Sequence, residues 1–280
     1  MSQATEQRVK DKLKQLSKAS NTPFNLLLDT LFLERFLVRI GQSAYADKLI
    51  FKGGMCLAQF IDIGRETKDI DFLLTQIEGS IDTIKTVIEE IAILDVGDDF
   101  IFSSISVVEL SLQHKKYPGY RITVQGQLGQ IKNKVSIDIG VGDVVRPRVL
   151  DVELMGSKGL LFEDNITLSA YPPEYIFSEK VEAILYLGEL NSRMKDFYDC
   201  YQLIRRNVLD VAILKAAISE TLENRGTPLS LIPDSIDLFD ARWKAFLRKN
   251  KIDELNLNDV IAEINKVMKD MIKADRKSVV

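Results

Sequence analysis

Histidine and cysteine are scarce in this chain of 280 residues, which has one histidine and two cysteines. A zinc site usually draws its ligands from several such side chains, so His114 on its own argues against one. The same scarcity argues against a Ser-His-Asp triad, because no second histidine is present as an alternative base. Cys56 and Cys200 each lie in an apolar helical run, and we expect both to be buried free thiols in a reducing cytoplasm.

Long apolar runs and an excess of basic residues are also missing. No segment approaches the length of a membrane span, and the N-terminus has no apolar signal core. We therefore expect a cytoplasmic protein without a membrane partner. The formal net charge of −4 gives no overall basic surface for nucleic acid, so any contact with RNA needs a local patch. The hydrophobic content of 46% is enough for a packed core in one large domain or two small ones.

The most informative segment contains two aspartates one residue apart, Asp69 and Asp71, inside a strand-like stretch. Residues two apart in a strand share a face, so the two carboxylates point the same way, opposite to Ile70 and Phe72. Neighbouring carboxylates repel each other unless a cation lies between them. Oxygen ligands at this spacing suit Mg²⁺, which takes one or two carboxylates and completes its shell with waters and substrate phosphates.

A double glycine, Gly53-Gly54, precedes this pair and stands just before a helix-like run at residues 55–60. A glycine turn that opens a helix lets backbone N–H groups approach a phosphate. Neither the double glycine nor the paired aspartates are specific alone. Together they predict a phosphate-binding turn followed by a metal site.

A third aspartate, Asp138, lies in the segment KVSIDIG on the strand face opposite Val135, Ile137 and Ile139. Two interpretations are open. Asp138 could join the other aspartates from a neighbouring strand, and three carboxylates could then hold two metal ions for nucleotidyl transfer. Alternatively, it lies on the solvent face of an antiparallel sheet.

The segments KGGMCL, RETKDIDF, KVSIDIG, SEKVEAIL and RMKDFYD occur in this order between Leu49 and Leu203. In order and spacing they resemble the motifs of the AbiEii/AbiGii nucleotidyltransferase toxin family, part of the DNA polymerase β-like nucleotidyltransferase superfamily. The resemblance is more specific for the family than for the substrate.

The resemblance implies roles for individual residues. Asp69, Asp71 and Asp138 would bind Mg²⁺, with two ions when an NTP is bound, and Lys180 and Asp196 would complete the catalytic set. The implied nucleotide-binding residues are Lys52, Gly53, Gly54, Arg65, Thr67, Lys180 and Arg193. Many relatives carry Ser or Thr after the second glycine, whereas this chain has Met55 and therefore lacks that hydroxyl contact to phosphate.

Each of these residues also has a purely structural interpretation. Lys180 is flanked by Glu179 and Glu182, so it could form a surface ion pair. Asp196 falls in the first turn of an expected helix, where a carboxylate complements the helix dipole. Basic residues before and after the third aspartate could receive a nucleic-acid backbone or simply be solvated. These basic residues are Lys115, Lys116, Lys132, Lys134, Arg146, Arg148 and Lys158.

Hydrophobic periodicity and turn residues predict the remaining elements. Thr22 and Pro23 predict a helix start, and Ser80 predicts a helix cap. We expect a short, loosely attached helix within residues 1–20. Further helices are expected at 23–40, 81–91, 174–187, 210–224, 237–249 and 256–275, and strands at 101–110, 120–124, 135–139 and 166–168, with residues 142–165 mostly loop.

The predicted fold is α+β, with a nucleotidyltransferase core built on a mixed, mostly antiparallel sheet with helices on one face. Residues 1–170 would form this core with its N-terminal helices, and residues 171–280 a helical domain that closes the active-site cleft. The resemblance implies Mg²⁺-dependent transfer of NMP from an NTP to an acceptor hydroxyl, by the toxin of a bacterial toxin–antitoxin or abortive-infection system. It also implies tRNA as an acceptor and a winged-helix antitoxin as partner.

Two alternatives to this function stay open. One is a nucleotidyltransferase acting on a small-molecule or protein hydroxyl. The other is a catalytically inactive relative that binds a nucleotide or an antitoxin, for which Met55 is the sequence support.

Overall fold

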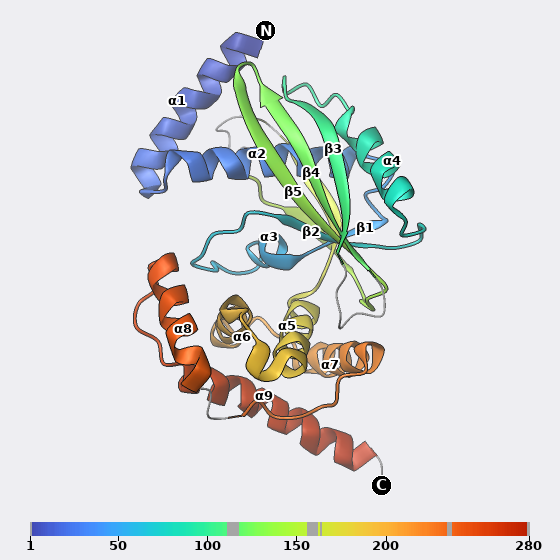
Figure 1. Ribbon diagram of the computed structural model, residues 1–280, viewed down its shortest axis with the longest axis vertical. Coiled ribbons are helices and arrows are strands. Elements are labelled where there is room, and N and C mark those ends of the chain that lie inside the picture. The colour runs from blue at the N-terminus through green and yellow to red at the C-terminus, as the bar shows by residue number, and fades with distance from the viewer. Residues whose placement is uncertain (1, 111–117, 156–161, 163, 234–236, 279–280) are drawn as a thin grey trace. The chain divides into compact units, whose positions relative to one another are not determined.

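The computed structural model describes residues 2–110, 118–155, 162, 164–233 and 237–278 (Figure 1). The basic residues Lys115, Lys116 and Lys158, together with His114, lie outside these described residues. The chain divides into two compact units. Unit 1 comprises Met1–Gln59, Thr67–Gly142 and Pro147–Ala170, and unit 2 comprises Phe60–Glu66, Asp143–Arg146 and Tyr171–Val280.

Unit 1 is built on a seven-stranded sheet with the strand order β3-β4-β5-β2-β1-β7-β6. The β2–β5 and β1–β7 pairs are parallel and the other pairs are antiparallel, which confirms the predicted mixed, mostly antiparallel sheet. The strands are β1 Leu49–Lys52, β2 Ile70–Leu74, β3 Ile101–Leu110, β4 Gly119–Leu128, β5 Ile131–Val141, β6 Arg148–Val152 and β7 Ile166–Ala170.

Strands β4 and β5 are longer than predicted, because the turn between them is only Gly129 and Gln130. Gly129 has φ +57°, a conformation that glycine adopts without strain. Residues 131–134, which precede the predicted strand 135–139, therefore extend β5. Strand β6 was wrongly predicted as loop, because it is largely exposed and its sequence RVLDV shows no alternation of buried and exposed positions.

The helices of unit 1 are α1 Ser2–Ser20, α2 Phe24–Gln42, α3 Gly53–Leu57 and α4 Ile81–Ala92. Ser80 caps α4 as predicted, by accepting a hydrogen bond from the Thr83 backbone N–H. Helix α2 instead begins one residue later than predicted, with Pro23 rather than Thr22 at its N-cap. Helix α3 begins at Gly53 itself, two residues before the predicted start.

Helix α1 is docked rather than loosely attached, which corrects the expectation from its polar composition. Val9 and Leu13 on one face are fully buried. Glu6 accepts a hydrogen bond of 2.8 Å from the Gln130 backbone N–H in the β4–β5 turn. The helix therefore packs by a narrow apolar stripe and one buried carboxylate.

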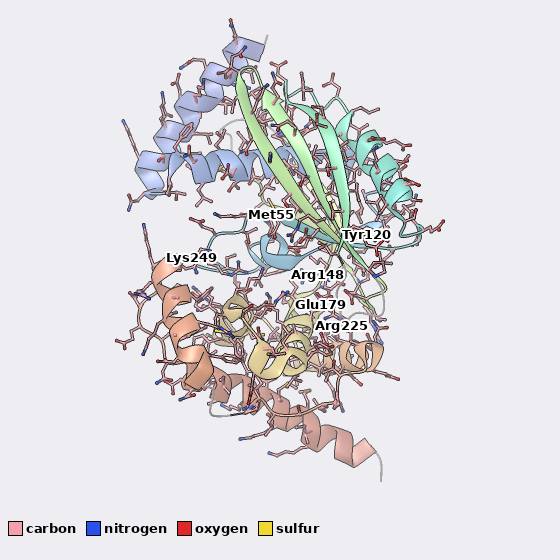
Figure 2. The ribbon with its side chains drawn as sticks, viewed as in Figure 1. Met55, Tyr120, Arg148, Glu179, Arg225 and Lys249 are labelled. Carbon is pink, nitrogen blue, oxygen red and sulfur yellow. The ribbon has the colours of Figure 1, made fainter. Side chains whose placement is uncertain are left out.

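Helices α2 and α4 pack against the sheet, α2 on β5 and β7 and α4 on β3 (Figure 1). The alternating residues of β4 and β5 that face these helices are fully buried, among them Ile122, Val124, Ile137 and the labelled Tyr120 of Figure 2. The residues between them along each strand face the other way. The sheet thus has one face in the core and one polar face, and the polar face carries the aspartates.

A buried ion network ties α2 to the segment before β3. Arg39 donates to both carboxylate oxygens of Asp98, at 2.8 and 2.9 Å, and Arg35 donates to Asp98 at 2.6 Å. The two guanidinium groups hold the pKa of Asp98 below its ordinary value although burial alone would raise it. The network fixes one end of α2 against the sheet.

The C-terminal segment of unit 2, from Tyr171 onward, consists of helices joined by loops in its described part, as predicted. Helix α5 begins at Pro173, whose fixed φ suits the first helical position, and α7 ends before Gly226, which is in the left-handed conformation. No helix in the described residues has the length and hydropathy to span a membrane. The helices are α5 Pro173–Leu187, η1 Gly188–Leu190, α6 Met194–Arg205, α7 Val211–Arg225, α8 Asp237–Asn250 and α9 Leu257–Ser278.

Candidate active site

Four charged residues form a row across neighbouring strands of unit 1. Lys52 on β1 pairs with Asp71 on β2, and Asp71 pairs with Asp138 on β5. Asp138 in turn pairs with Arg121 on β4. Residues paired across strands present their side chains to the same face of a sheet. The register therefore places a lysine, two carboxylates and an arginine side by side on the polar face.

The structure brings the three predicted metal ligands, Asp69, Asp71 and Asp138, together. One carboxylate oxygen from each lies within 4.8 Å of the others, and all three side chains are half-buried. Oxygen ligands of an octahedral Mg²⁺ at about 2.1 Å lie about 3 to 4 Å apart, so small adjustments would let all three bind one ion. Hard, half-buried oxygen donors at this spacing fit Mg²⁺.

Arg121 holds the third carboxylate through two hydrogen bonds. Its Nε donates to one oxygen of Asp138 at 2.9 Å and its terminal nitrogen to the other at 2.6 Å. The hydrogen bond to Asp138 is the main cause that raises the pKa of Arg121, and the charges of Asp69 and Asp71 add to it. The guanidinium is thus a fixed positive charge beside the aspartate cluster.

Sequence reasoning did not identify Arg121 as a site residue. Arg121 lies between Tyr120 and Ile122 in a strand that alternates apolar and polar residues. Its location on the polar face could therefore have been predicted. The register between β4 and β5, which sets it beside Asp138, could not be derived from the strand pattern alone.

Gly53 lies directly under the Asp71 carboxylate. It has φ +73°, and a Cβ atom on this residue would lie 1.9 Å from an Asp71 oxygen. Only glycine leaves room for the carboxylate at this position. Gly54 follows in the first turn of α3, a helix of five residues, and the Met55 side chain is buried at 7% exposure (Figure 2). The methionine side chain is therefore packed inside the protein.

The other predicted nucleotide ligand of unit 1 is Thr67, which lies half-buried in the segment that leads into β2. The remaining predicted residues lie in unit 2 and form a cluster of their own. Lys180 on α5 contacts Asp196 at 3.0 Å and Asp199 at 2.6 Å, both on α6. Arg193 donates to Asp196 at 2.5 Å, and Arg65 binds both oxygens of Asp199 at 2.7 and 2.6 Å.

Lys180, Asp196 and Asp199 of this unit 2 cluster are buried, which contradicts the interpretation of Lys180 as half of a surface ion pair. Lys180 is 9% exposed, and its partners are the two α6 aspartates rather than its sequence neighbours. Burial lowers the pKa of Lys180, but Asp199 and Asp196 outweigh it and raise the pKa above its ordinary value. For Asp196, burial raises the pKa, yet Lys180 and Arg193 outweigh it and bring it to about 2.

Asp199 was not predicted as part of the cluster. It lies three residues after Asp196 on α6, a spacing that puts both carboxylates on one helix face. That spacing in the motif RMKDFYD was a usable signal for its position.

The glutamates that flank Lys180 have a different partner. Arg225, at the end of α7, contacts Glu179 at 2.9 Å, Glu182 at 2.7 Å and Asp143 at 2.8 Å (Figure 2). All three partners hold the guanidinium charge in place and raise the pKa of Arg225 against the effect of burial. This network joins α5 to α7 and leaves Lys180 to the α6 aspartates.

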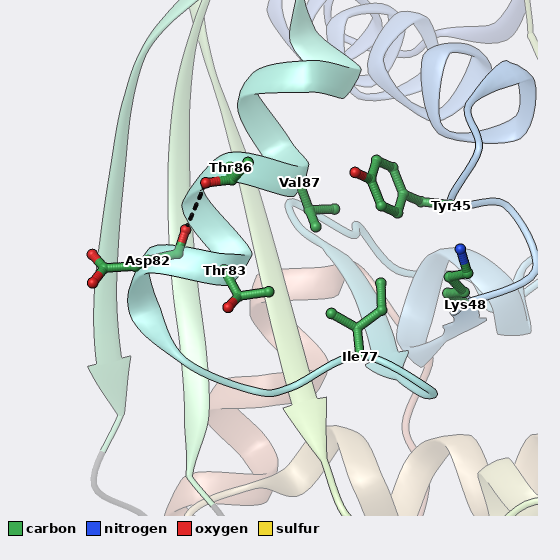
Figure 3. A pocket seen from close by; sticks show the side chains of 7 residues that line it. All are labelled: Tyr45, Lys48, Ile77, Asp82, Thr83, Thr86 and Val87. Atoms are coloured by element: carbon green, nitrogen blue, oxygen red, sulfur yellow. Dashed lines mark hydrogen bonds between the residues drawn. The ribbon is translucent and has the colours of Figure 1, made fainter.

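A pocket of about 450 Å³ lies elsewhere on unit 1, between α4 and the segment that precedes β1 (Figure 3). It contains none of the predicted site residues. Its charged lining residues are Lys48 and Asp82, and the Thr86 hydroxyl within it donates to the Asp82 backbone carbonyl at 3.0 Å. Asp82 is the one carboxylate among its lining residues, so the pocket does not resemble the aspartate cluster, which has three.

Comparison with known proteins identifies solved structures with a similar fold and a matching family. No curated protein is similar enough to the chain to count as a relative. Among solved structures, MenT4, a nucleotidyltransferase toxin from Mycobacterium tuberculosis, shares 16% identity at a TM-score of 0.54, covering 94% of this chain and 97% of its own. JHP933 from Helicobacter pylori shares 13% identity at a TM-score of 0.51, covering 90% and 94%. At these identities the likeness concerns the fold.

The family described as "Nucleotidyl transferase AbiEii toxin, Type IV TA system" matches residues 35–264, which include every residue of the aspartate cluster and of the unit 2 cluster. The chain therefore belongs to the AbiEii family of nucleotidyltransferase toxins.

Proposed function

We propose that this protein transfers a nucleoside monophosphate from an NTP to an acceptor hydroxyl in a Mg²⁺-dependent reaction. The observation that carries the proposal is the aspartate cluster, whose three carboxylates lie within 4.8 Å of one another in a member of a nucleotidyltransferase family. Three negative charges close together on a polar sheet face are suited to divalent cations, which in turn bind a triphosphate.

The reaction forms a bond between the acceptor oxygen and the α-phosphorus and breaks the bond from that phosphorus to pyrophosphate. Asp69, Asp71 and Asp138 would hold Mg²⁺, with a second ion when NTP is bound, and the metal supplies neutralisation of the phosphate charge. Asp138 accepts the hydroxyl proton. Each oxygen of Asp138 retains a lone pair beyond its hydrogen bond to Arg121, which orients the carboxylate.

The backbone at Gly53 and Gly54 binds the triphosphate, and the Lys52 and Thr67 side chains assist from unit 1. The absence of a side chain on Gly53 supports this role, because it leaves the backbone open beside Asp71.

In unit 2, Lys180, Arg65 and Arg193 bind nucleotide phosphate, and Asp196 positions Lys180. Three cations and the two carboxylates Asp196 and Asp199 give the cluster a net positive charge, which supports binding of an anion. The Arg193 side chain is 50% exposed and can contact a ligand without leaving Asp196.

The acceptor we propose is tRNA, and the partner is an antitoxin of the winged-helix type in the cytoplasm. The description of the family as toxins of a type IV toxin–antitoxin system supports an antitoxin partner. The tRNA acceptor and the winged-helix fold of the antitoxin rest on the motif resemblance.

The test is incubation of the full chain with each labelled NTP, Mg²⁺ and total bacterial tRNA. The Asp71→Asn variant removes one charge from the cluster, and Asp47→Asn, an exposed carboxylate in the turn before β1, is the matched control. We expect label on tRNA with the wild type and with Asp47→Asn, and at least a hundredfold less with Asp71→Asn.

Label on a protein or small molecule instead of tRNA would contradict the proposal that tRNA is the acceptor. It would still support the proposed nucleotidyl transfer. Mg²⁺-dependent NTP binding without transfer to any acceptor would contradict the reaction itself and favour the binding-only alternative.

A further inference from the structure

The polar face of β3, β4 and β5 continues away from the aspartate cluster as three further rows of paired residues. The first row after Arg121 and Asp138 is Ser106, Thr123 and Ser136. The second row is Ser103, Gln125 and Lys134, and the third is Ile101, Gln127 and Lys132. We call these nine residues, all polar except the exposed Ile101, the polar track.

The helices of unit 1 that pack on these strands do so on the opposite face, where Ile122, Val124 and Ile137 are buried (Figure 1). The side chains of Ser103, Ser106, Lys132 and Lys134 are exposed. A face this rich in hydroxyl, amide and ammonium groups is solvated unless a polar partner covers it.

The charged residues of the polar track are both positive. None of its nine residues is acidic, and Lys132 and Lys134 follow each other on one face of β5. Neither lysine forms an ion pair within the described part of the chain. The track is therefore complementary to an anion, in contrast to the chain as a whole, whose net charge is −4.

The dimensions suit a nucleic-acid strand. Successive rows are two residues apart, so the distance from the Asp138 row to the Lys132 row is about 20 Å. At a rise of about 3.4 Å per nucleotide this length accommodates about six nucleotides. A small acceptor molecule would occupy only the end beside Asp138.

The composition of the track also indicates how such a strand would be held. Sheets that recognise single-stranded RNA by its bases present aromatic side chains for stacking, and the nine residues here include none. Lysines, hydroxyls and amides contact phosphate and sugar groups instead, so the recognition is insensitive to base sequence.

We propose that the polar track binds the backbone of an RNA acceptor near its 3′ end, with Lys132 and Lys134 contacting phosphates and the terminal hydroxyl lying at Asp138. The proposal rests on the proposed nucleotidyl transfer and specifies the acceptor as a polynucleotide strand. The track, rather than the aspartate cluster, then selects an RNA over a small molecule.

The experiment compares the full-length wild type with a Lys132→Gln/Lys134→Gln double variant. The matched control is Lys14→Gln/Lys18→Gln, which removes two exposed lysine charges from α1 in the same unit. The probe is a 12-nucleotide single-stranded RNA labelled at its 5′ end, and binding is followed by fluorescence anisotropy at several salt concentrations. Thermal unfolding establishes that all three proteins are folded, and calorimetry with Mg²⁺ and ATP measures nucleotide binding.

We expect the track variant to bind the RNA about tenfold more weakly, with a salt slope shallower by about 1.4, because two phosphate contacts are lost. Its binding of Mg²⁺–ATP should equal that of the wild type, and the control should match the wild type in both assays. Changing the RNA sequence at constant length should alter the affinity less than twofold.

RNA binding by the track variant that equals the wild type would overturn the proposal, even if nucleotidyl transfer to RNA is observed. A different result would separate the RNA-binding proposal from the proposed reaction. Weakened RNA binding in a protein that transfers no nucleotide to any RNA would support the polar track as an RNA-binding surface and overturn the proposed reaction.

Discussion

Arg121 and Asp138 lie directly opposite each other on β4 and β5, and the guanidinium of Arg121 binds both carboxylate oxygens of Asp138. The pair is not deeply buried, with side-chain exposures of 51% and 23%. An exposed ion pair contributes little to folding, about 0 to 1 kcal/mol. Its position beside Asp69 and Asp71 gives it a larger effect on the charge of the site than on the stability of the sheet.

Replacement of Arg121 by Gln should tighten the binding of divalent cations. The guanidinium competes with the cation for the oxygens of Asp138, and its removal takes one positive charge away from the aspartate cluster. We expect Mn²⁺, measured by calorimetry in the absence of nucleotide, to bind about tenfold more tightly, equivalent to about 1.4 kcal/mol. Unchanged or weaker Mn²⁺ binding would show that the arginine instead helps to form the metal site.

Replacement of Gly53 by Ala should abolish metal binding and nucleotidyl transfer, because the added Cβ would lie 1.9 Å from an Asp71 oxygen and displace that carboxylate. Gly97→Ala is the matched control. Gly97 has φ +72°, nearly the same as +73° at Gly53, but an added Cβ there meets no atom within 4 Å. Both variants should lose about 1 kcal/mol from backbone strain in urea unfolding, and only Gly53→Ala should lose Mn²⁺ affinity. Loss of affinity in both would assign the effect to strain.

Replacement of Asp196 by Asn should destabilise the protein at neutral pH and have less effect in acid. The folded pKa of Asp196 is about 2, against an ordinary value of 3.8, so the carboxylate stabilises the fold above pH 4. This contribution, about 2 kcal/mol, disappears as the pH falls from about 4 to about 2. Urea unfolding at pH 7, 5, 4 and 3 measures the difference between wild type and variant.

The control for this series is Asp240→Asn, an exposed carboxylate paired with Lys244 on α8, which should change stability by less than about 0.5 kcal/mol at every pH. A difference between wild type and Asp196→Asn that stays constant down to pH 3 would contradict the lowered pKa.

Replacement of Arg39 by Met should destabilise unit 1 by about 3 kcal/mol, because it leaves the buried Asp98 with only part of its compensating charge. The measurement is chemical unfolding followed by circular dichroism, with Lys85→Met as control. Lys85 forms an exposed pair with Glu89 within α4, so its loss should cost less than about 0.5 kcal/mol. A stability equal to that of the wild type would mean that Arg35 alone satisfies Asp98.

Local periodicity was sufficient to predict much of this protein. The alternation of Ile70 and Phe72 with the two aspartates placed both carboxylates on one face, and the register of β2 agrees. The α+β class and the mixed sheet were predicted correctly from the order of strands and helices. The cap at Ser80 was predicted because capping depends only on residues three apart.

What could not be predicted depends on contacts between distant segments. Which strands are neighbours, and in what register, decides that Asp138 meets Asp71 and that Arg121 meets Asp138. The burial of Lys180 was missed because its sequence neighbours are acidic, whereas α6 supplies its actual partners. The docking of α1 was missed because two buried apolar residues in a polar helix give a weak pattern.

The pairing pattern also has a consequence for how the chain folds. The β4–β5 hairpin has a two-residue turn, and such hairpins form within about 1–10 μs, whereas the parallel pairing of β5 with β2 closes a long loop containing α4 and β3. We therefore expect Arg121 to meet Asp138 early in folding, while the hairpin is still separate from β2. On this order of events, the arginine would accompany Asp138 as the hairpin docks and would screen it from the like charge of Asp71. Arg121, which competes with the metal in the folded protein, would in this way help the aspartate cluster to form during folding.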